Sequence, residues 1–363
     1  MHATDDHAEA DRIMTVCNSC RYCEGLCAVF PAMELRRTFP DGELDYLANL
    51  CHGCGACYYD CQFSPPHEFN VDVPRIFARL RAQSYARYAW PGAFSFFFAR
   101  NGRTVSAAAA IGIVLFLAGL ALFDGASFLA PHAGAGAFYA LMPHEAMVVV
   151  FGVAFVGALV ALGAGLAKFW RATASGRQKP ATSDLLQAVR DAAELRYLDG
   201  GGSGCMNEGE QPTDRRALFH HLTFYGFLLC FAATCVATLY HYALGREAPY
   251  PWYSIPVLLG TVGGAGLVVG SAGLLAAKLR RDPELREPET LGMDIAFIVM
   301  LLLVGASGLA LLLLRATPAM GALLAIHLGL VLALFVTMPY GKFVHGLYRF
   351  AALVRYARET ESP

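Results

Sequence analysis

Charged residues are scarce in this chain of 363 residues, because only 16% are Asp, Glu, Lys or Arg and 56% are hydrophobic. Soluble globular domains carry about 25% charged residues, so this composition excludes an ordinary soluble protein and predicts several membrane spans. A basic stripe is also missing, since the arginine-rich stretches adjoin apolar runs and the net charge is −1. We therefore expect membrane lipid around the chain and no nucleic acid as a partner.

An apolar signal segment is absent as well. Residues Met1 to Arg12 are acidic, so we expect no secretory signal, and we interpret the segment up to about Ile13 as a mobile tail in the cytoplasm. The chain also shows no nucleophile–base pair, no paired carboxylates and no basic substrate pocket. We therefore predict that any organic substrate is transformed on a separate protein.

Eight of the eleven cysteines occur in two copies of one motif. Each copy reads C-x2-C-x2-C-x3-C, the bacterial run that holds a cubane iron–sulfur (4Fe–4S) cluster. In that run three thiolates bind one cluster and the fourth binds the other cluster. The first predicted ligand set is Cys17, Cys20, Cys23 and Cys61. The second predicted ligand set is Cys51, Cys54, Cys57 and Cys27.

A structural zinc module is the alternative interpretation of these cysteines, but zinc sites favour two C-x2-C pairs and four ligands per metal. The two-two-three spacing fits paired clusters better. A reducing cytoplasm also favours thiolate–metal chemistry over disulfide bonds. The residues between Cys27 and Cys51 show helical spacing of leucines, which favours an α-helical ferredoxin-type domain over the small βαβ-type ferredoxin.

Six apolar stretches are long enough to cross about 30 Å of hydrocarbon. They lie at 104–123, 144–169, 217–243, 254–277, 291–314 and 319–345. Lys and Arg gather at alternate ends of these stretches, so we expect both termini and the cluster domain on the cytoplasmic side of a bacterial inner membrane. The predicted fold is all-α, with an α-helical two-cluster domain at 1–74, an amphipathic interfacial hinge at 75–103, and a six-helix transmembrane bundle at 104–350 with a cytoplasmic loop at 171–216.

Five histidines, His220, His221, His241, His327 and His345, lie on two of the predicted spans. Ionisable residues inside a membrane are costly and usually functional. On one continuous helix, His327 and His345 would share a face about 27 Å apart. Opposite helix directions bring His220 to His345 at the cytoplasmic side, and His241 to His327 at the outer side. We predict one or two bis-histidine b-type haems on these pairs; polar residues at the membrane interface are the alternative.

The remaining candidate residues favour structural roles. His144 opens the second span as an interfacial residue, and His52 and His67 are expected on the surface of the small head. Cys205 is interpreted as a structural or surface thiol. The glycine-rich stretch 200–205 lacks the strand and helix that flank a phosphate-binding loop. We expect the cytoplasmic loop to dock either the cluster domain or a soluble partner.

Several features together resemble the tricarballylate and citrate utilisation protein B family from about Cys17 to Arg355. They are the double cysteine run, the strap Pro65-Pro66-His67, the loop Gly200 to Cys205, and the pattern His220-His221 followed by Tyr225-Gly226-Phe227. The spacing of His327 and His345 also resembles the haem helix of respiratory nitrate reductase gamma subunits. The cysteines match the family motif residue by residue.

The resemblance implies a membrane iron–sulfur and haem protein that reoxidises the reduced flavin of a partner FAD-dependent dehydrogenase. Electrons would then pass through two 4Fe–4S clusters and haem b to the membrane quinone pool. The organic substrate would be oxidised on the flavoprotein, and no residue of this chain would be catalytic. Two other functions stay open: a self-sufficient quinone-linked reductase of the heterodisulfide-reductase type, and a redox-sensing membrane anchor.

Overall fold

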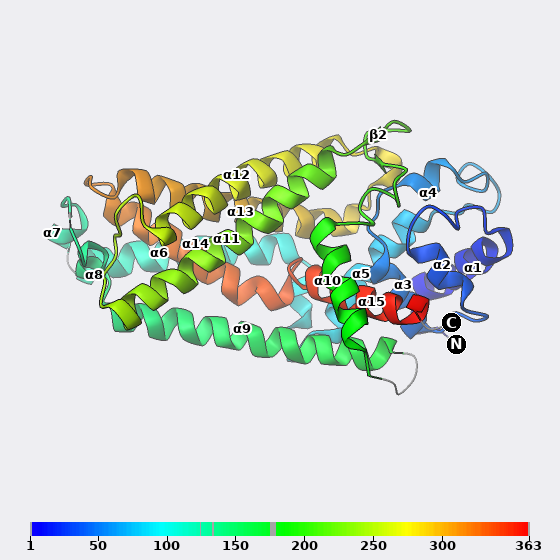
Figure 1. The fold of residues 1–363 in the computed structure, drawn as a ribbon, viewed down its shortest axis with the longest axis horizontal. Coiled ribbons are helices and arrows are strands. Elements are labelled where there is room, and N and C mark those ends of the chain that lie inside the picture. Colours follow the sequence, from blue (N-terminus) through cyan, green and yellow to red (C-terminus); the bar gives the residue numbers. More distant parts are fainter. Residues whose placement is uncertain (1, 124, 133, 175–178, 362–363) are drawn as a thin grey trace.

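An elongated, all-α protein is seen in the computed structural model (Figure 1), which describes residues 2–123, 125–132, 134–174 and 179–361. A helical head lies at one end, beside both ends of the chain, and the long helices extend away from it. The predicted fold class is confirmed. Strand within the described residues is limited to one antiparallel pair, β1 (Cys205–Met206) and β2 (Pro212–Thr213).

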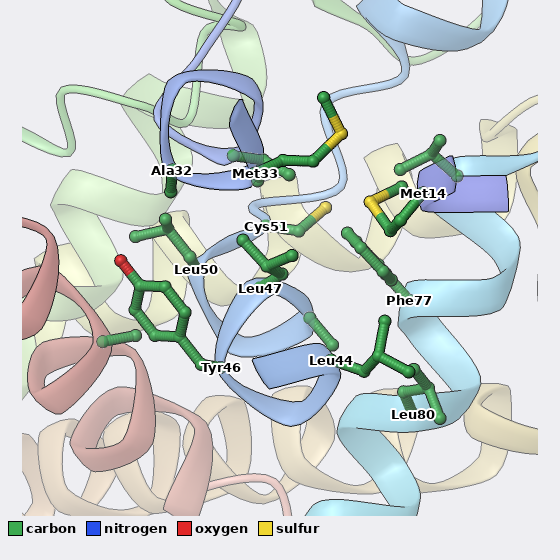
Figure 2. Packing of buried hydrophobic residues seen from close by; sticks show 14 of the residues in the cluster. Met14, Ala32, Met33, Leu44, Tyr46, Leu47, Leu50, Cys51, Phe77 and Leu80 are labelled. Atoms are coloured by element: carbon green, nitrogen blue, oxygen red, sulfur yellow. The ribbon is translucent and has the colours of Figure 1, made fainter. Parts of the chain in front are cut away.

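Five helices form the head. They are α1 (Asp5–Cys20), α2 (Val29–Glu34), α3 (Asp41–Leu50), α4 (Ala56–Tyr59) and α5 (Val73–Tyr88). Leucines recur at helical spacing along α3, so one apolar face forms when the chain coils. Figure 2 shows this face, with Leu44 and Leu47 towards Phe77 of α5 and Leu50 beside Ala32 of α2; all of them belong to the head core. The segment between the two cysteine motifs is therefore helical, as predicted.

The N-terminal segment is a helix rather than the mobile tail that we predicted. Thr4 caps α1 by accepting a hydrogen bond from the backbone N–H of His7. Ala10, Ile13 and Met14 are then fully buried in the head core. The acidic residues that suggested a tail lie in the first turn of this helix, where a carboxylate interacts favourably with the helix dipole.

Within the described residues, six helices are long and apolar enough to cross a membrane, which makes this a multi-pass membrane protein. They are α6 (Asn101–Phe123), α9 (His144–Thr173), α11 (Arg215–Leu244), α12 (Ile255–Arg280), α13 (Pro288–Leu314) and α14 (Met320–Thr337). Shorter elements connect them: η1 (Gly92–Phe98), α7 (Gly125–Phe128), α8 (Ala137–Leu141), α10 (Thr182–Glu194) and η2 (Pro283–Leu285). The number of spans agrees with the sequence prediction.

The sixth span ends earlier than predicted. After α14 come the 3-10 turn η3 (Met338–Tyr340), an extended Gly341 and a separate helix, α15 (Val344–Glu361). Pro339 lacks a backbone donor and so favours a break at this point. His327 and His345 therefore lie on two different helices. The shared face that we predicted for these two histidines on one continuous helix is wrong.

Small residues let the membrane helices approach closely. A Cβ on Gly226 of α11 would lie 2.6 Å from the backbone nitrogen of Leu267 on α12, and a Cβ on Gly112 of α6 would lie 2.5 Å from the carbonyl of Gly329 on α14. Such small-residue contacts are typical of helix pairs in membranes, where lipid supplies no hydrophobic driving force between helices.

The head and the bundle share two helices. The first half of α5 buries Phe77 and Leu80 in the head core, whereas its second half buries Tyr85 and Tyr88 among residues of the bundle. Helix α15 contributes Ala352, Leu353 and Val354 to the head core. The predicted hinge at 75–103 thus begins inside a helix that packs on both parts.

A buried ionic network fastens α15 to the head. Arg355 is 1% exposed, and its guanidinium contacts Glu43 of α3 at 2.5 Å and Glu359 at 2.8 Å. Arg36 contacts the same two carboxylates at 2.5 and 2.6 Å. Arg355 also donates to the backbone carbonyl of Thr173, the last residue of α9. Each buried charge therefore has a partner, and the network joins three parts of the fold.

Replacing Arg355 should strongly destabilise this joint. Arg355→Met leaves Glu43 and Glu359 partly unpaired in a buried site, and breaking a buried pair costs about 3–5 kcal/mol. Thermal unfolding and limited proteolysis of the purified protein in detergent would measure the loss. The matched control is Arg190→Met, because Arg190 forms an exposed pair with Glu194 on α10 that is worth at most about 0.5 kcal/mol. Equal effects in the two variants would contradict the structural role of the network.

Candidate functional site: two cysteine cavities and a histidine pair

The first predicted cysteine set lines one cavity in the part of the head that is farther from the bundle. Its sulfur-bearing residues are Cys17, Cys20, Cys23 and Cys61. The chain reverses direction directly after α1, because Arg21 adopts a left-handed conformation with φ of 56°. This reversal returns Cys23 towards Cys17. The backbone N–H of Phe63 donates to the Cys61 sulfur at 3.4 Å, a contact that favours the thiolate.

The second predicted set lines a separate cavity nearer the bundle. Its sulfur-bearing residues are Cys27, Cys51, Cys54 and Cys57. Gly53 and Gly55 have φ of +62° and +90°, which other residues rarely adopt, and they fold the loop around this cavity. The backbone N–H of Gly53 donates to the Cys51 sulfur at 3.3 Å. In both cavities, three cysteines of one motif meet the last cysteine of the other.

The chemistry of these thiols favours a metal centre. Burial raises the pKa of Cys17 and of Cys23 to about 12 and that of Cys54 to about 11, so the thiols stay protonated at neutral pH unless a metal binds them. Within the described residues, no group of three or more His, Cys, Asp or Glu side chains is close enough to hold a single metal ion. The four cysteines around each cavity match the ligand number of a cubane iron–sulfur cluster.

The two cavities differ in exposure. Cys20 is exposed, and Tyr22, which lines the first cavity, is 73% exposed. The second cavity is covered by the long loop between α9 and α11. In that loop Gly200 lies against the Cys54 sulfur, and Cys205 is buried with its thiol directed at the Cys54 carbonyl. Cys205 is therefore not a surface thiol, and the loop packs on the head.

The structure brings His220 and His345 together at the head end of the bundle. Their ring centroids are 6.4 Å apart. An iron held between two imidazole nitrogens at about 2 Å from each would place the centroids about 6 Å apart. The Nδ1 atom of His345 is 2.5 Å from the Lys342 carbonyl, an arrangement that leaves Nε2 free as a metal ligand. The separation of the two rings is therefore compatible with one iron held between them.

The outer histidines are arranged differently from the prediction. His241 stacks on His144 with ring centroids 3.8 Å apart, which leaves no room for an iron between the rings. His327 lies against α13, where its Nδ1 is 3.0 Å from the Ser307 hydroxyl. His241 and His327 form no ring contact in the part of the chain that the structure describes. His144, which we interpreted as interfacial, is thus the neighbour of His241.

Sequence reasoning missed three residues between the second cavity and the histidine pair. His52 is 9% exposed rather than on the surface, because residues distant in sequence, such as Tyr197 and Arg216, pack on it. Burial lowers the pKa of His52 well below its ordinary value. Arg216 lies four residues before His220, and Arg349 lies four residues after His345. The repeated Arg–His spacing of one helical turn is the signal that could have identified these arginines.

The glycine loop offers a matched test of the cover over the second cavity. A Cβ at Gly201 would collide with the Leu26 carbonyl, whereas a Cβ at Gly202 would meet nothing within 4 Å; both glycines have positive φ. Both alanine variants carry about 1–2 kcal/mol of backbone strain. We expect Gly201→Ala to displace the loop and lose iron in air several-fold faster than Gly202→Ala. Equal iron loss in timed iron assays would show that the loop does not protect the cavity.

Comparison with known proteins agrees with this architecture. The family described as Citrate utilization protein B matches residues 99–363, and its Fer4-like domain matches residues 10–87. The Citrate utilization protein B of Escherichia coli is 50% identical over 357 residues, which cover 98% of this chain and 93% of that protein. No solved structure matches the chain. The protein therefore belongs to the citrate utilization protein B family.

Proposed function

We propose that this protein carries single electrons from the reduced flavin of a partner FAD-dependent dehydrogenase to quinone in a bacterial inner membrane. Membership of a family named for citrate utilisation, with a Fer4-like N-terminal domain, supports iron–sulfur electron transfer in the use of citrate or tricarballylate. The observation that carries the proposal is the row formed by the first cavity, the second cavity and the His220–His345 pair.

Adjoining contacts connect the members of this row. Phe30 lines both cysteine cavities, so the two cavities are neighbours. Arg216 and Arg349 bind backbone carbonyls of residues 49–53 beside the second cavity. Each arginine lies one helical turn, about 6 Å along the axis, from one histidine of the pair.

The side chains suit these cofactors. The four thiolates of each cavity would hold one 4Fe–4S cluster, and His220 and His345 would hold the iron of one haem b. Such groups exchange one electron at a time, which lets a two-electron flavin be reoxidised in steps. We restrict the proposal to the inner haem, because the stacking of His241 on His144 does not suit an iron between them.

The direction of electron flow follows from exposure and charge. The first cavity has the exposed Cys20 and Tyr22 at its rim, so we place the flavoprotein there. Lys and Arg residues flank the head end of the spans, and the loops at the opposite end carry Arg246 and Arg315. The positive-inside rule therefore supports a cytoplasmic head and electron flow into the membrane. Exposed apolar faces of α9 and α11 leave a lipid quinone access to the bundle.

Cofactor analysis of the purified protein tests the proposal. We expect about eight iron atoms per chain in two cubane clusters, one low-spin b haem, bleaching of both by a reduced partner flavoprotein, and reoxidation by quinone. Zinc instead of iron would contradict it. Turnover of a disulfide without a partner would favour the heterodisulfide-reductase type, and haem reoxidation that a quinone analogue does not slow would favour a redox sensor.

Histidine variants test the inner haem separately. His345→Ala and His220→Ala should each abolish the low-spin haem spectrum, because each removes one axial ligand, while the iron–sulfur signals persist. His241→Ala is the matched control on the same helix as His220 and should retain the haem. Optical spectra together with iron and haem counts would measure these effects. Haem loss in His241→Ala with retention in His345→Ala would contradict the assignment.

A further inference from the structure

Four arginines converge on the backbone of residues 48–53, the segment that precedes Cys54 in the second cavity. They come from α5, α11, the end of α12 and α15, and we name them the arginine collar: Arg81, Arg216, Arg281 and Arg349. Arg81 donates to the carbonyls of Ala48 and Cys51 at 3.0 and 3.1 Å, and Arg349 to those of Asn49 and Cys51 at 3.3 and 2.8 Å. Arg216 donates to the carbonyls of His52 and Gly53 at 3.0 and 2.8 Å, and Arg281 to that of Gly53 at 3.0 Å.

No carboxylate of the described residues is in ion-pair contact with the collar, whereas Arg36, Arg79 and Arg355 each have such a contact. Asp294 acts at longer range on Arg216 and Arg281, but it is itself paired with Lys278 and Lys342. A guanidinium stays charged in proteins, so all four arginines are cationic at neutral pH. Partly buried cations without a counter-charge in contact are costly, which points to a negative group at this place.

The first cavity has the opposite electrostatic surroundings. Asp60 lies beside the first site, because it directly precedes the ligand Cys61. Arg216 lies beside the second site, where it donates to the carbonyls of His52 and Gly53. The first site therefore lies beside an acidic group and open water, and the second lies beside cations in a covered pocket.

We propose that the arginine collar gives the second cluster site a higher reduction potential than the first, which makes it the electron sink of the head. The inference rests on the proposed function. In the step concerned, one electron leaves the first site, which is oxidised, and enters the second site, which is reduced; no bond forms or breaks. The added negative charge is attracted to the guanidinium groups, and the interaction is strong where water is excluded.

Redox titration of the full-length protein followed by EPR tests the collar. Arg216→Gln and Arg349→Gln should each lower the midpoint potential of the second cluster and leave that of the first unchanged. Loss of a signal in Cys54→Ser assigns it to the second cluster. Arg349→Lys keeps the positive charge, so the midpoint potential of its second cluster should stay close to the wild-type value. The control is Arg190→Gln, since Arg190 is exposed on α10 and should change neither potential.

Each outcome bears on the inference. An unchanged second potential in both glutamine variants, with both clusters assembled, would overturn it. If these variants lose iron, Arg281→Gln is the second test, because it removes one positive charge and only one hydrogen bond. An unchanged potential of the second cluster in Arg281→Gln would also overturn the inference. A wild-type protein without two clusters would overturn the proposed function as well. An equal shift at both clusters would show a general charge effect and reject the collar as the cause.

Discussion

A buried guanidinium must find oxygen atoms to bind, and this requirement fixes how the head sits on the membrane bundle. At the first turn of α3, Arg36 and Arg355 share the carboxylates of Glu43 and Glu359. At the end of α3, the arginine collar binds backbone carbonyls of residues 48–53. Arginine suits both tasks, because its planar fork of donors stays charged when partly buried. Residues 48–53, which precede Cys54, are thereby bound in part by α11 and by the end of α12, which belong to the bundle.

Regular patterns made much of the fold and site predictable. Apolar runs of membrane length identify spans, because backbone groups in lipid must be bonded within a helix. The spacing of the two motifs predicted that each set combines three cysteines of one motif with the last cysteine of the other, since side chains three residues apart on tight turns converge. His220 and His345 followed from helix direction alone. These inferences needed only local periodicity and the number of spans, both of which a sequence displays.

Other features depend on contacts that no local pattern encodes. Residues 319–345 read as one apolar run, so the break at Pro339 and Gly341 was hidden, and with it the separation of His327 from His345. His52 looked exposed, because its burial comes from loops and helices distant in sequence. The acidic N-terminal residues suggested a tail, yet α1 gains its stability from burying Ile13 and Met14 against other head helices. Tertiary packing decided each case.

The placement of α15 in the head core has a consequence for biosynthesis. The cysteine motifs leave the ribosome first, but Ala352, Leu353 and Val354 complete the core around them. At about 5–20 residues per second, the remaining chain takes tens of seconds to synthesise. During that interval the membrane helices insert while the thiols wait without their final packing. The core of the head is therefore complete only after the last helix of the chain has been made.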